Sequence, residues 1–302
     1  GTGASLNVSL PGVYTVKATA PNGCSSTDDV RVILNQVAPA DVALVGGELT
    51  CTVTSLQLSA SSSTGGTRYL WTGPGTIDNA NTATPTVYAD GTYTCTATNP
   101  VTGCETVKTV VVGLNNTTPN VSAGLDQTLT CTTTSVTLTG SSTTPGVQFS
   151  WSGPGFTSAD AIVAVSTEGI YTLTVTDLVN GCTATDQVEV KINRTAPNVS
   201  AGEDQTITCT TTEVTLTGSS TTPDAQFSWS GPGFTSSSAI VTVTVEGIYT
   251  LTVTDPVNGC KATDQVEVKL DKTPPNVSAG EDQTITCTTE SVTLTGSSTT
   301  PD

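Results

Sequence analysis

Nine cysteines are the residues of this chain whose spacing most clearly predicts chemistry. Eight of them occupy two recurring positions: one set is Cys51, Cys131, Cys209 and Cys287, and the other is Cys24, Cys104, Cys182 and Cys260. No two cysteines have the C-x-x-C spacing that a zinc or redox-active site would need. Repeated cysteine pairs without that spacing predict disulfides, and therefore an oxidising, extracellular compartment.

The absence of histidine excludes the commonest catalytic sites. Without it the chain cannot build a Ser-His-Asp or Cys-His centre, or a zinc site with histidine ligands. Two carboxylates, Asp264 and Glu267, recur as Asp186 and Glu189 and could in principle hydrolyse glycosides. They lie in a regular strand pattern without signs of a cleft. We therefore predict no catalytic residue and a protein that is not an enzyme.

The charge of the chain excludes two classes of partner. Acidic residues outnumber basic ones by 26 to 9, which gives a net charge of -17. Lys and Arg, not carboxylates, attract nucleic-acid phosphates and anionic lipid surfaces, so neither is an expected partner. No run of roughly 18 apolar residues is present, and we expect no membrane insertion.

Acidic side chains near the ends of predicted strands are the candidates for a metal site. Oxygen ligands from Asp204, Asp264 and Asp271 could hold a structural calcium ion between repeats. The alternative is that these residues close turns and solubilise the surface, which we favour because no EF-hand or Asp-x-Asp-x-Asp run occurs. No other metal or cofactor is predicted.

The sequence is built from copies of one unit. The hexapeptide Pro-Asn-Val-Ser-Ala-Gly begins at Pro119, Pro197 and Pro275, with a step of 197 − 119 = 78 residues. The predicted organisation is the C-terminal part of a repeat at 1–36, a diverged repeat at 37–116, repeats at 117–194 and 195–272, and the N-terminal part of a repeat at 273–302. Because both ends fall within a repeat, we expect a stretch of a longer protein whose secretion signal, anchor and binding region lie outside it.

Each complete repeat carries the pattern of short antiparallel strands. In repeat 195–272, apolar and polar residues alternate in five segments, which are 214–217, 227–229, 241–245, 249–253 and 266–270. Period two between turn residues is typical of strands with one buried face. About seven short strands in a unit of this size are typical of a β-sandwich. Thr, with about 65 of the 302 residues, also favours strands.

Two aromatic positions indicate the kind of sandwich. A Trp falls on the third predicted strand and a Tyr on the sixth; these core residues are Trp71, Trp151 and Trp229, and Tyr93, Tyr171 and Tyr249. They correspond to the core Trp and the tyrosine corner of Ig-like domains. The disulfide that usually joins the two sheets is absent, since Leu138 and Leu216 occupy its first position. The predicted fold is all-β, with tandem Ig-like β-sandwich repeats of about 78–80 residues in an elongated rod.

Two further side-chain types have specific predicted roles. Cys95 takes the place that Leu173 and Leu251 have in other repeats, so we expect a buried free thiol there rather than a disulfide. Phe156 and Phe234 follow Gly-Pro-Gly and are the candidates for exposed aromatic contacts.

Four motifs give the chain a resemblance to a known family. They are Pro-Asn-Val-Ser-Ala-Gly-Glu-Asp-Gln-Thr-Ile-Thr-Cys from Pro197, Val-Thr-Leu-Thr-Gly-Ser-Ser from Val214, Trp-Ser-Gly-Pro-Gly from Trp229, and Gly-Ile-Tyr-Thr-Leu-Thr-Val-Thr-Asp from Gly247 with Asn-Gly-Cys after it. The pattern resembles the PKD-like/Ig-like repeats of giant secreted adhesins and appendage proteins of gliding Bacteroidota. The resemblance covers essentially the whole sequence. It implies export by the type IX secretion route and a location on the extracellular cell surface.

The recurring cysteines allow two pairing schemes: within repeats, as Cys51–Cys104, Cys131–Cys182 and Cys209–Cys260, or between neighbours, as Cys51–Cys182 and Cys131–Cys260. Strand direction favours the second scheme, because the first strand ends at the bottom of a repeat and the last hairpin lies at its top. These ends are roughly 25 Å apart, whereas a disulfide needs Cα atoms about 4.4–6.8 Å apart. A kink of the first strand at 202–204 would weaken this argument. In the second scheme Cys24, Cys104, Cys209 and Cys287 have partners outside the sequence.

These features predict a structural shaft: a disulfide-stiffened rod in a cell-surface fibre or adhesin that mediates attachment to surfaces or other cells. Repetition favours self-association into a homo-oligomeric fibre or bundle, because a contact made by one repeat can recur along its neighbour. A cell-surface or glycan ligand would bind regions outside the sequence. The alternative is a set of spacer or carbohydrate-binding repeats in a secreted polysaccharide-degrading enzyme, which would expose aromatic residues on one face.

Overall fold

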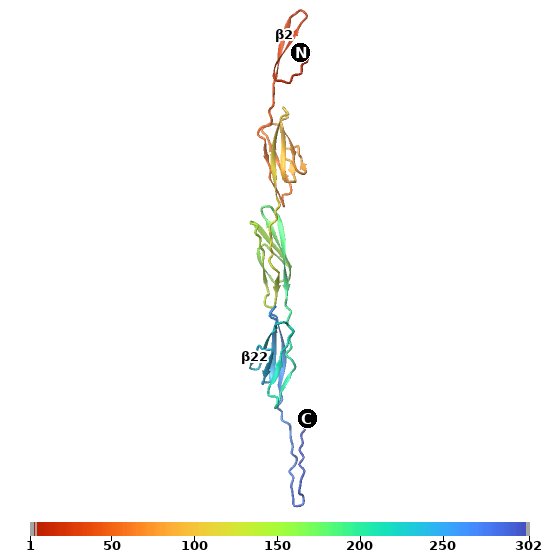
Figure 1. Ribbon diagram of the computed structural model, residues 1–302, viewed down its shortest axis with the longest axis vertical. Helices are drawn as coiled ribbons and strands as arrows, with labels where there is room; N and C mark the ends of the chain where they lie inside the picture. The colour runs from red at the N-terminus through yellow and green to blue at the C-terminus, as the bar shows by residue number, and fades with distance from the viewer. Residues whose placement is uncertain (1–2, 4, 300–302) are drawn as a thin grey trace.

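The computed structural model describes residues 3 and 5–299 and shows an elongated rod with the chain termini towards opposite ends (Figure 1). Three separate hydrophobic cores follow one another along the chain, within residues 37–116, 117–194 and 195–272. The described residues contain strands and no α-helix, so the predicted all-β fold is confirmed. The outermost residues of the two partial repeats, 1–2, 4 and 300–302, lie outside the described residues.

The two regular repeats have the same seven strands. In repeat 117–194 they are β12 (Gln127–Leu129), β13 (Val136–Thr139), β14 (Val147–Gly153), β15 (Phe156–Ser158), β16 (Ile162–Val165), β17 (Gly169–Asp177) and β18 (Thr183–Ile192). In repeat 195–272 they are β19 (Gln205–Ile207), β20 (Val214–Thr217), β21 (Gln226–Gly231), β22 (Phe234–Ser236), β23 (Ile240–Val243), β24 (Gly247–Thr254) and β25 (Lys261–Leu270). One sheet has the order β12-β18-β17-β14-β15 and the other is β13-β16, with β19-β25-β24-β21-β22 and β20-β23 as their counterparts. The core between the two sheets makes each repeat an Ig-like β-sandwich.

The remaining parts of the chain depart from this regular pattern. Repeat 37–116 contains β3 (Ala43–Val45), β4 (Glu48–Thr50), β5 (Leu56–Gln57), β6 (Ser59–Ser61), β7 (Arg68–Thr72), β8 (Ile77–Asp78), β9 (Thr86–Val87), β10 (Gly91–Thr98) and β11 (Glu105–Asn115). Its largest sheet has the order β4-β11-β10-β7. The first partial repeat contributes the hairpin of β1 (Gly12–Thr19) and β2 (Ser25–Val32). Residues 273–299 carry only isolated bridges, among them Ser278–Ser297.

The first strand of each regular repeat changes sheets partway along. Ser200 forms an antiparallel bridge with Ser219, whereas β19 pairs in parallel with β25. Gly202 lies between these two segments with a φ of 85°, a conformation that glycine adopts without steric cost. The kink considered at 202–204 is therefore present, and it moves the strand from one sheet to the other.

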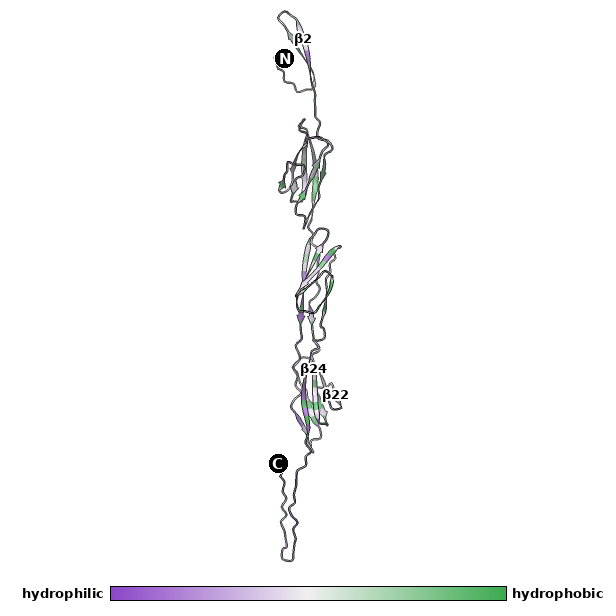
Figure 2. Ribbon diagram, turned by 180° about the vertical axis from the view of Figure 1, so that it is seen from behind, coloured by the Kyte–Doolittle hydropathy of each residue, from purple (hydrophilic) through white to green (hydrophobic). Residues whose placement is uncertain are grey.

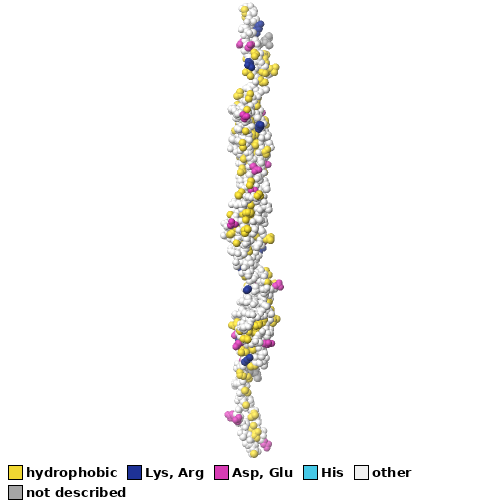
Figure 3. All heavy atoms as spheres, turned by 90° about the vertical axis from the view of Figure 1, so that its left-hand side faces the viewer, with side chains coloured by type: hydrophobic (Ala, Val, Ile, Leu, Met, Phe, Trp, Pro, Cys, Tyr) yellow, Lys and Arg dark blue, Asp and Glu magenta, His cyan; other side chains and the backbone are white. Residues whose placement is uncertain are grey.

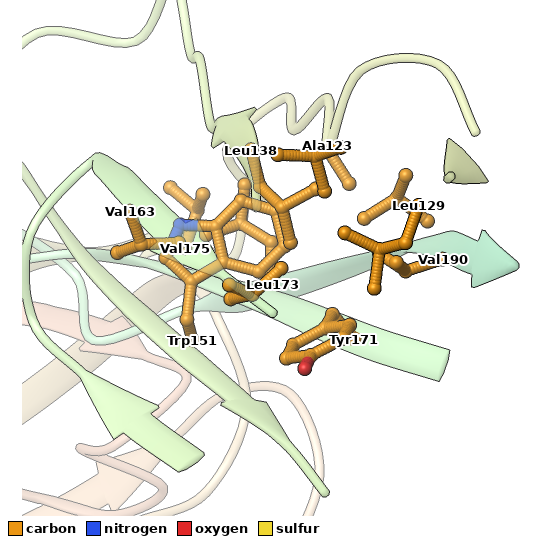
Figure 4. Packing of buried hydrophobic residues seen from close by; sticks show 12 residues of the cluster. Ala123, Leu129, Leu138, Trp151, Val163, Tyr171, Leu173, Val175 and Val190 are labelled. Carbon is orange, nitrogen blue, oxygen red and sulfur yellow. The ribbon is translucent and has the colours of Figure 1, made fainter. Parts of the chain in front are cut away.

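Trp151 occupies the centre of the core of repeat 117–194 (Figure 4). Its side chain is fully buried, and its indole Nε1 donates a hydrogen bond to Ala161 O at 3.3 Å. Leu173 is its cross-strand partner on β17, and Leu138 approaches from the other sheet. Burying a large apolar side chain stabilises a fold by roughly 1.5–3 kcal/mol. This explains why each complete repeat carries one Trp at this position.

Tyr171 closes the other end of the same core. Its hydroxyl donates to Thr167 O, four residues earlier, at 2.9 Å, and Tyr249 makes the same bond to Val245 O. The Tyr171 ring lies against Gly153, where an added Cβ would come within 2.3 Å of the ring. The glycine of the Trp-Ser-Gly sequence is therefore required by the packing of this tyrosine corner.

The rod has apolar interiors and a largely uncharged polar surface. Along β24, buried Tyr249, Leu251 and Val253 alternate with partly exposed threonines. Figure 2 shows the same mixture of apolar and polar residues along the strands of the complete repeats, and Figure 3 shows only scattered charged side chains. Among the described residues, no helix has the length and apolar character that a membrane span requires.

Candidate functional site at the junctions between repeats

Two disulfides join neighbouring repeats. Cys51 is bonded to Cys182 and Cys131 to Cys260, with a Cα–Cα distance of 5.1 Å in each pair. The bonded residues are 131 and 129 positions apart, so each bond links the end of the first strand of one repeat to the last hairpin of the next. The described residues contain none of the within-repeat pairs, Cys51–Cys104, Cys131–Cys182 or Cys209–Cys260. The pairing in the structure is the one that strand direction favoured.

On one side of each bond the cysteine lies in a tight turn, here named the threonine turn (residues 50–53 and 130–133). Thr130 N donates to Thr133 O at 2.9 Å. Thr130 Oγ1 in turn accepts hydrogen bonds from Thr132 N at 3.3 Å and from Thr133 N at 2.9 Å. Because a threonine hydroxyl can bond to nearby backbone in this way, it holds the turn without help from a strand. The turn presents its cysteine to the next repeat.

On the other side the cysteine ends a hairpin, here named the Asn-Gly-Cys hairpin (residues 177–182 and 255–260). Cys260 N donates to Asn258 Oδ1 at 2.8 Å. Gly259 has a φ of 68°, in the left-handed region that favours glycine. Both disulfide-bonded cysteines of these hairpins are buried, so the bond lies away from solvent.

The asparagine of the same hairpin holds the linker between the repeats. Asn258 Nδ2 donates to Asn193 Oδ1 at 3.1 Å and to Thr195 O at 2.9 Å. Asn180 makes the equivalent pair of bonds at the preceding junction. Each of these two asparagines is only 2% exposed. Since a buried amide that lacks partners is costly, these bonds fix the linker against the hairpin.

The role of the asparagines was missed in the sequence, where Asn258 and Gly259 were treated as turn residues. The available signal was the recurrence of Asn-Gly-Cys at 180 and 258, a step of 258 − 180 = 78 residues. A turn alone needs no such strict repetition of its sequence.

The backbones of neighbouring repeats also touch at the junction. Cys131 N donates to Asn258 O at 3.2 Å across the boundary. A Cβ added to Gly259 would lie 2.6 Å from Thr132 Cγ2, and one added to Gly181 would meet Thr52 in the same way. The hairpin therefore seats directly on the threonine turn, with no space for a side chain between them.

The boundary before repeat 37–116 retains the polar contacts with different residues. Asn99 Nδ2 and Thr102 Oγ1 both donate to Val37 O, at 2.9 and 2.8 Å. Cys104, at the position of Cys182, is a free cysteine here. The hydrogen bonds to the linker can therefore form at a boundary that has no disulfide in the structure.

The acidic residues considered for calcium act as acceptors for backbone N–H groups. Asp264 Oδ2 accepts from Ala201 N at 2.8 Å, and Asp204 Oδ1 accepts from Glu267 N at 3.0 Å. Asp271 Oδ1 accepts from the nitrogen of the residue two positions later. Among the residues that the structure describes, no three His, Cys, Asp or Glu side chains form a group that could hold a metal ion. The first two carboxylates connect the first strand of a repeat to its last.

Cys95 is a free thiol in the core of repeat 37–116. It pairs in register with Trp71 on the neighbouring strand and is fully buried. Burial raises the pKa of the Cys95 thiol from 9.0 to about 11, because the thiolate would lose its hydration. The side chain fills the core and takes no part in the junctions.

The two phenylalanines considered for exposed contacts pack at the margin of the core. Phe156 meets Tyr171 edge to face with ring centroids 5.9 Å apart, and Phe234 meets Tyr249 at 6.0 Å. Both rings are partly buried against the hydrophobic clusters of their repeats. These residues support the tyrosine corner and do not form a flat exposed platform for a sugar ring.

The comparisons with known proteins concern the fold. No family model matches the sequence, and no curated protein does either. Solved structures that are similar include an I-band fragment of titin (15% identity, 78% of this chain and 99% of that chain, TM-score 0.36) and immunoglobulin domains of Sidekick-1 (12%, 87% and 67%, TM-score 0.33). Another is the set of three N-terminal domains of the Highly Immunogenic Outer Capsid protein of bacteriophage RB49 (14%, 78% and 99%, TM-score 0.35).

The strand order, the buried Trp and the tyrosine corner identify the chain as a tandem array of Ig-like β-sandwiches. Arrays of this kind with disulfides are typical of extracellular structural or adhesion proteins.

Proposed function

We propose that the chain is the shaft of an extracellular cell-surface fibre or adhesin, which acts through its length and stiffness. The observation that carries the proposal is the pair of disulfides between neighbouring repeats, Cys51–Cys182 and Cys131–Cys260. Tandem domains ordinarily swing about their linkers. A second covalent connection beside the linker restricts that swing.

The contacts around each disulfide add to the stiffness. The linker is hydrogen-bonded to the buried Asn258, and Arg194 Nε donates to Thr130 O at 3.1 Å from within the linker region. The contact between Gly259 and Thr132 leaves no space into which the hairpin could tilt. Bending at this junction would have to separate all of these groups together.

The cellular location follows from the same bonds and from the family resemblance. Disulfides between repeats support an oxidising compartment. The resemblance of the motifs to repeats of gliding Bacteroidota supports export by the type IX secretion route and display at the cell surface.

Self-association of such rods into a homo-oligomeric fibre or bundle is part of the proposal. Two regular repeats with the same strands present the same outer faces twice along the rod, so one favourable contact could recur. The net charge of -17 opposes close approach of two rods at low ionic strength. Salt screens this repulsion, so association belongs to media of high ionic strength.

Immunogold electron microscopy of the source cells tests this function. Antibodies would be raised against residues 117–272 and applied to intact and to permeabilised cells, with preimmune serum as control. We expect gold particles along filaments outside intact cells. Labelling confined to the cell interior, or to dispersed soluble protein, would contradict the proposal.

A further inference from the structure

Both halves of the cross-repeat disulfide also occur without a partner. Cys209 lies in a threonine turn (residues 208–211), and Cys24 ends an Asn-Gly-Cys hairpin (residues 20–24). Each is an exposed, free cysteine. One half lies towards the C-terminal end of the rod and the other at its N-terminal end (Figure 1).

The turn at Cys209 already has the conformation that binds a hairpin elsewhere in the rod. Thr208 N donates to Thr211 O at 2.9 Å, and Thr208 Oγ1 accepts from Thr210 N at 3.3 Å and from Thr211 N at 3.1 Å. These are the hydrogen bonds of the turn at Cys131, which holds the hairpin of Cys260. The turn therefore needs no rearrangement to receive a hairpin.

The hairpin at Cys24 likewise has the conformation of the bonded hairpins. Cys24 N donates to Asn22 Oδ1 at 3.1 Å, and Ala20 N donates to Cys24 O at 2.9 Å. Gly23 has a φ of 82°, and nothing lies within 4 Å of the position its Cβ would take. The surface that Gly259 places against Thr132 is therefore free at Gly23.

The apolar residues beside the two halves are exposed where complete repeats bury them. Gly12 corresponds to Gly247, an offset of 247 − 12 = 235, so Val16 corresponds to Leu251. Val16 is 65% exposed, whereas Leu251 is fully buried. On the other side, Ile285 corresponds to Ile207 by the step of 78 residues; Ile285 is 63% exposed and Ile207 1%.

These exposed faces are complementary parts of one sandwich. Residues 6–32 correspond to 241–267, which carry β23, β24 and most of β25, and residues 277–294 correspond to 199–216, which carry β19 and part of β20. In a complete repeat β20 pairs with β23, and β19 pairs with β25. The first segment also borders a groove of about 720 Å³ that is lined by apolar side chains, including Leu6, Val8, Val16 and Val30. The segment 277–294 supplies the strands that such a groove accommodates in a complete repeat.

We propose that two copies of this chain associate head to tail, with residues 6–32 of one copy packed on residues 277–294 of the other. Cys24 of the first copy then meets Cys209 of the second, as Cys260 meets Cys131 within one chain. The same register brings Cys104 to Cys287, because the step is 104 − 24 = 80 on one side and 287 − 209 = 78 on the other. This contact would give the proposed fibre covalent continuity between copies, and it rests on that proposed function.

The bond between copies forms by thiol–disulfide exchange with an oxidant such as oxidised glutathione. The Cys24 thiolate attacks one glutathione sulfur and releases one glutathione thiolate. The Cys209 thiolate then attacks the mixed disulfide at the Cys24 sulfur and releases the second. The two cysteines lose two electrons and two protons in total, and one glutathione disulfide becomes two thiols.

Two full-length variants test the pairing. One retains Cys24 and carries Cys104→Ser, Cys209→Ser and Cys287→Ser; the other retains Cys209 and carries Cys24→Ser, Cys104→Ser and Cys287→Ser. They are mixed in a glutathione redox buffer, and the dimers are quantified by non-reducing electrophoresis and peptide mapping. We expect about tenfold more heterodimer than either homodimer, because docking raises the effective concentration of the matched thiols. Pairing in the random ratio, or no dimer, would overturn the proposal.

Gly23→Ala in the variant that retains Cys24 is the matched control. Its thiol stays exposed, but the added Cβ would meet Thr210 as a Cβ at Gly259 would meet Thr132. We expect heterodimer formation to fall to the random ratio while the rate of alkylation of Cys24 stays unchanged. An equal heterodimer yield with Gly23→Ala would contradict docking in this geometry. Immunogold labelling outside the cells together with random pairing would reject only the head-to-tail contact, whereas labelling confined to the cell interior would reject the shaft itself.

Discussion

At the scale of single residues, Cys95 and the exposed free cysteines have the same thiol in opposite environments. Cys95 is fully buried with a pKa raised to about 11, while Cys209 is exposed. Alkylation requires an accessible thiolate. We expect iodoacetamide at pH 8 to modify Cys209 within minutes and Cys95 only on the timescale of unfolding, as followed by mass spectrometry. Modification of both residues at the same rate in the folded chain would show that Cys95 is not buried.

The raised pKa of Cys95 also predicts how stability depends on pH. The folded-state pKa of about 11 exceeds the unfolded value of 9.0, so the folded state favours the protonated thiol. This contribution is fully present below pH 9 and is lost as the pH rises towards 11. Denaturation of the wild-type chain and of Cys95→Ala at several pH values checks this. The wild-type chain should lose more stability between pH 9 and 11 than the variant does.

Two hairpin glycines form a matched pair for testing the contact between repeats. Gly259 and Gly103 have φ angles of 68° and 72°, but only Gly259 faces a neighbouring repeat, at Thr132. Both Ala substitutions incur the left-handed backbone cost of about 1–2 kcal/mol. We expect Gly259→Ala alone to make Cys131–Cys260 about tenfold easier to reduce, measured by alkylation in a series of redox buffers. An equal effect of Gly103→Ala on that bond would mean that backbone strain, and not the contact, is responsible.

At the scale of elements, the Asn-Gly-Cys hairpin is the unit that fixes the linker. Asn258→Ala would leave Asn193 Oδ1 and Thr195 O without their buried donor. We expect a loss of about 1–3 kcal/mol in the free energy of unfolding, measured by chemical denaturation. Asn22→Ala is the control, because Asn22 is exposed and bonds only within its own hairpin in the structure's description. A comparable loss from Asn22→Ala would assign the effect to hairpin formation instead of the linker.

The strands could be predicted from the sequence because each has one buried face. The alternation through Tyr249, Leu251 and Val253 defines β24 without reference to any other element. The pairing of Cys131 could be favoured only by combining this pattern with strand direction. The role of Asn258 could not be predicted, since it depends on a linker 63 residues away that the fold brings beside the hairpin.

The same limitation applies to Phe156. Gly-Pro-Gly before it indicated an exposed loop, but the ring returns to the core against Tyr171. Local sequence fixes the turn, whereas the direction of a side chain after the turn depends on the neighbouring strand.

At the scale of the whole molecule, the net charge of -17 predicts how rods interact. Repulsion between rods extends over a Debye length of about 10 Å at 0.1 M salt and about 3 Å at 1 M. We expect lateral association to increase with sodium chloride concentration, measured by sedimentation velocity on the chain with its exposed free cysteines alkylated. Association that weakens as salt is added would mean that ion pairs, and not uncharged faces, hold the rods together.

The bending of single rods tests the central claim most directly. Electron microscopy would give the distribution of angles between repeats 117–194 and 195–272 in the oxidised chain and in the variant with Cys131→Ser and Cys260→Ser. The disulfide at this junction predicts a narrow distribution for the oxidised chain and a clearly broader one for the variant, with both repeats still folded. Distributions of equal width would contradict a shaft that is stiffened by disulfides between its repeats.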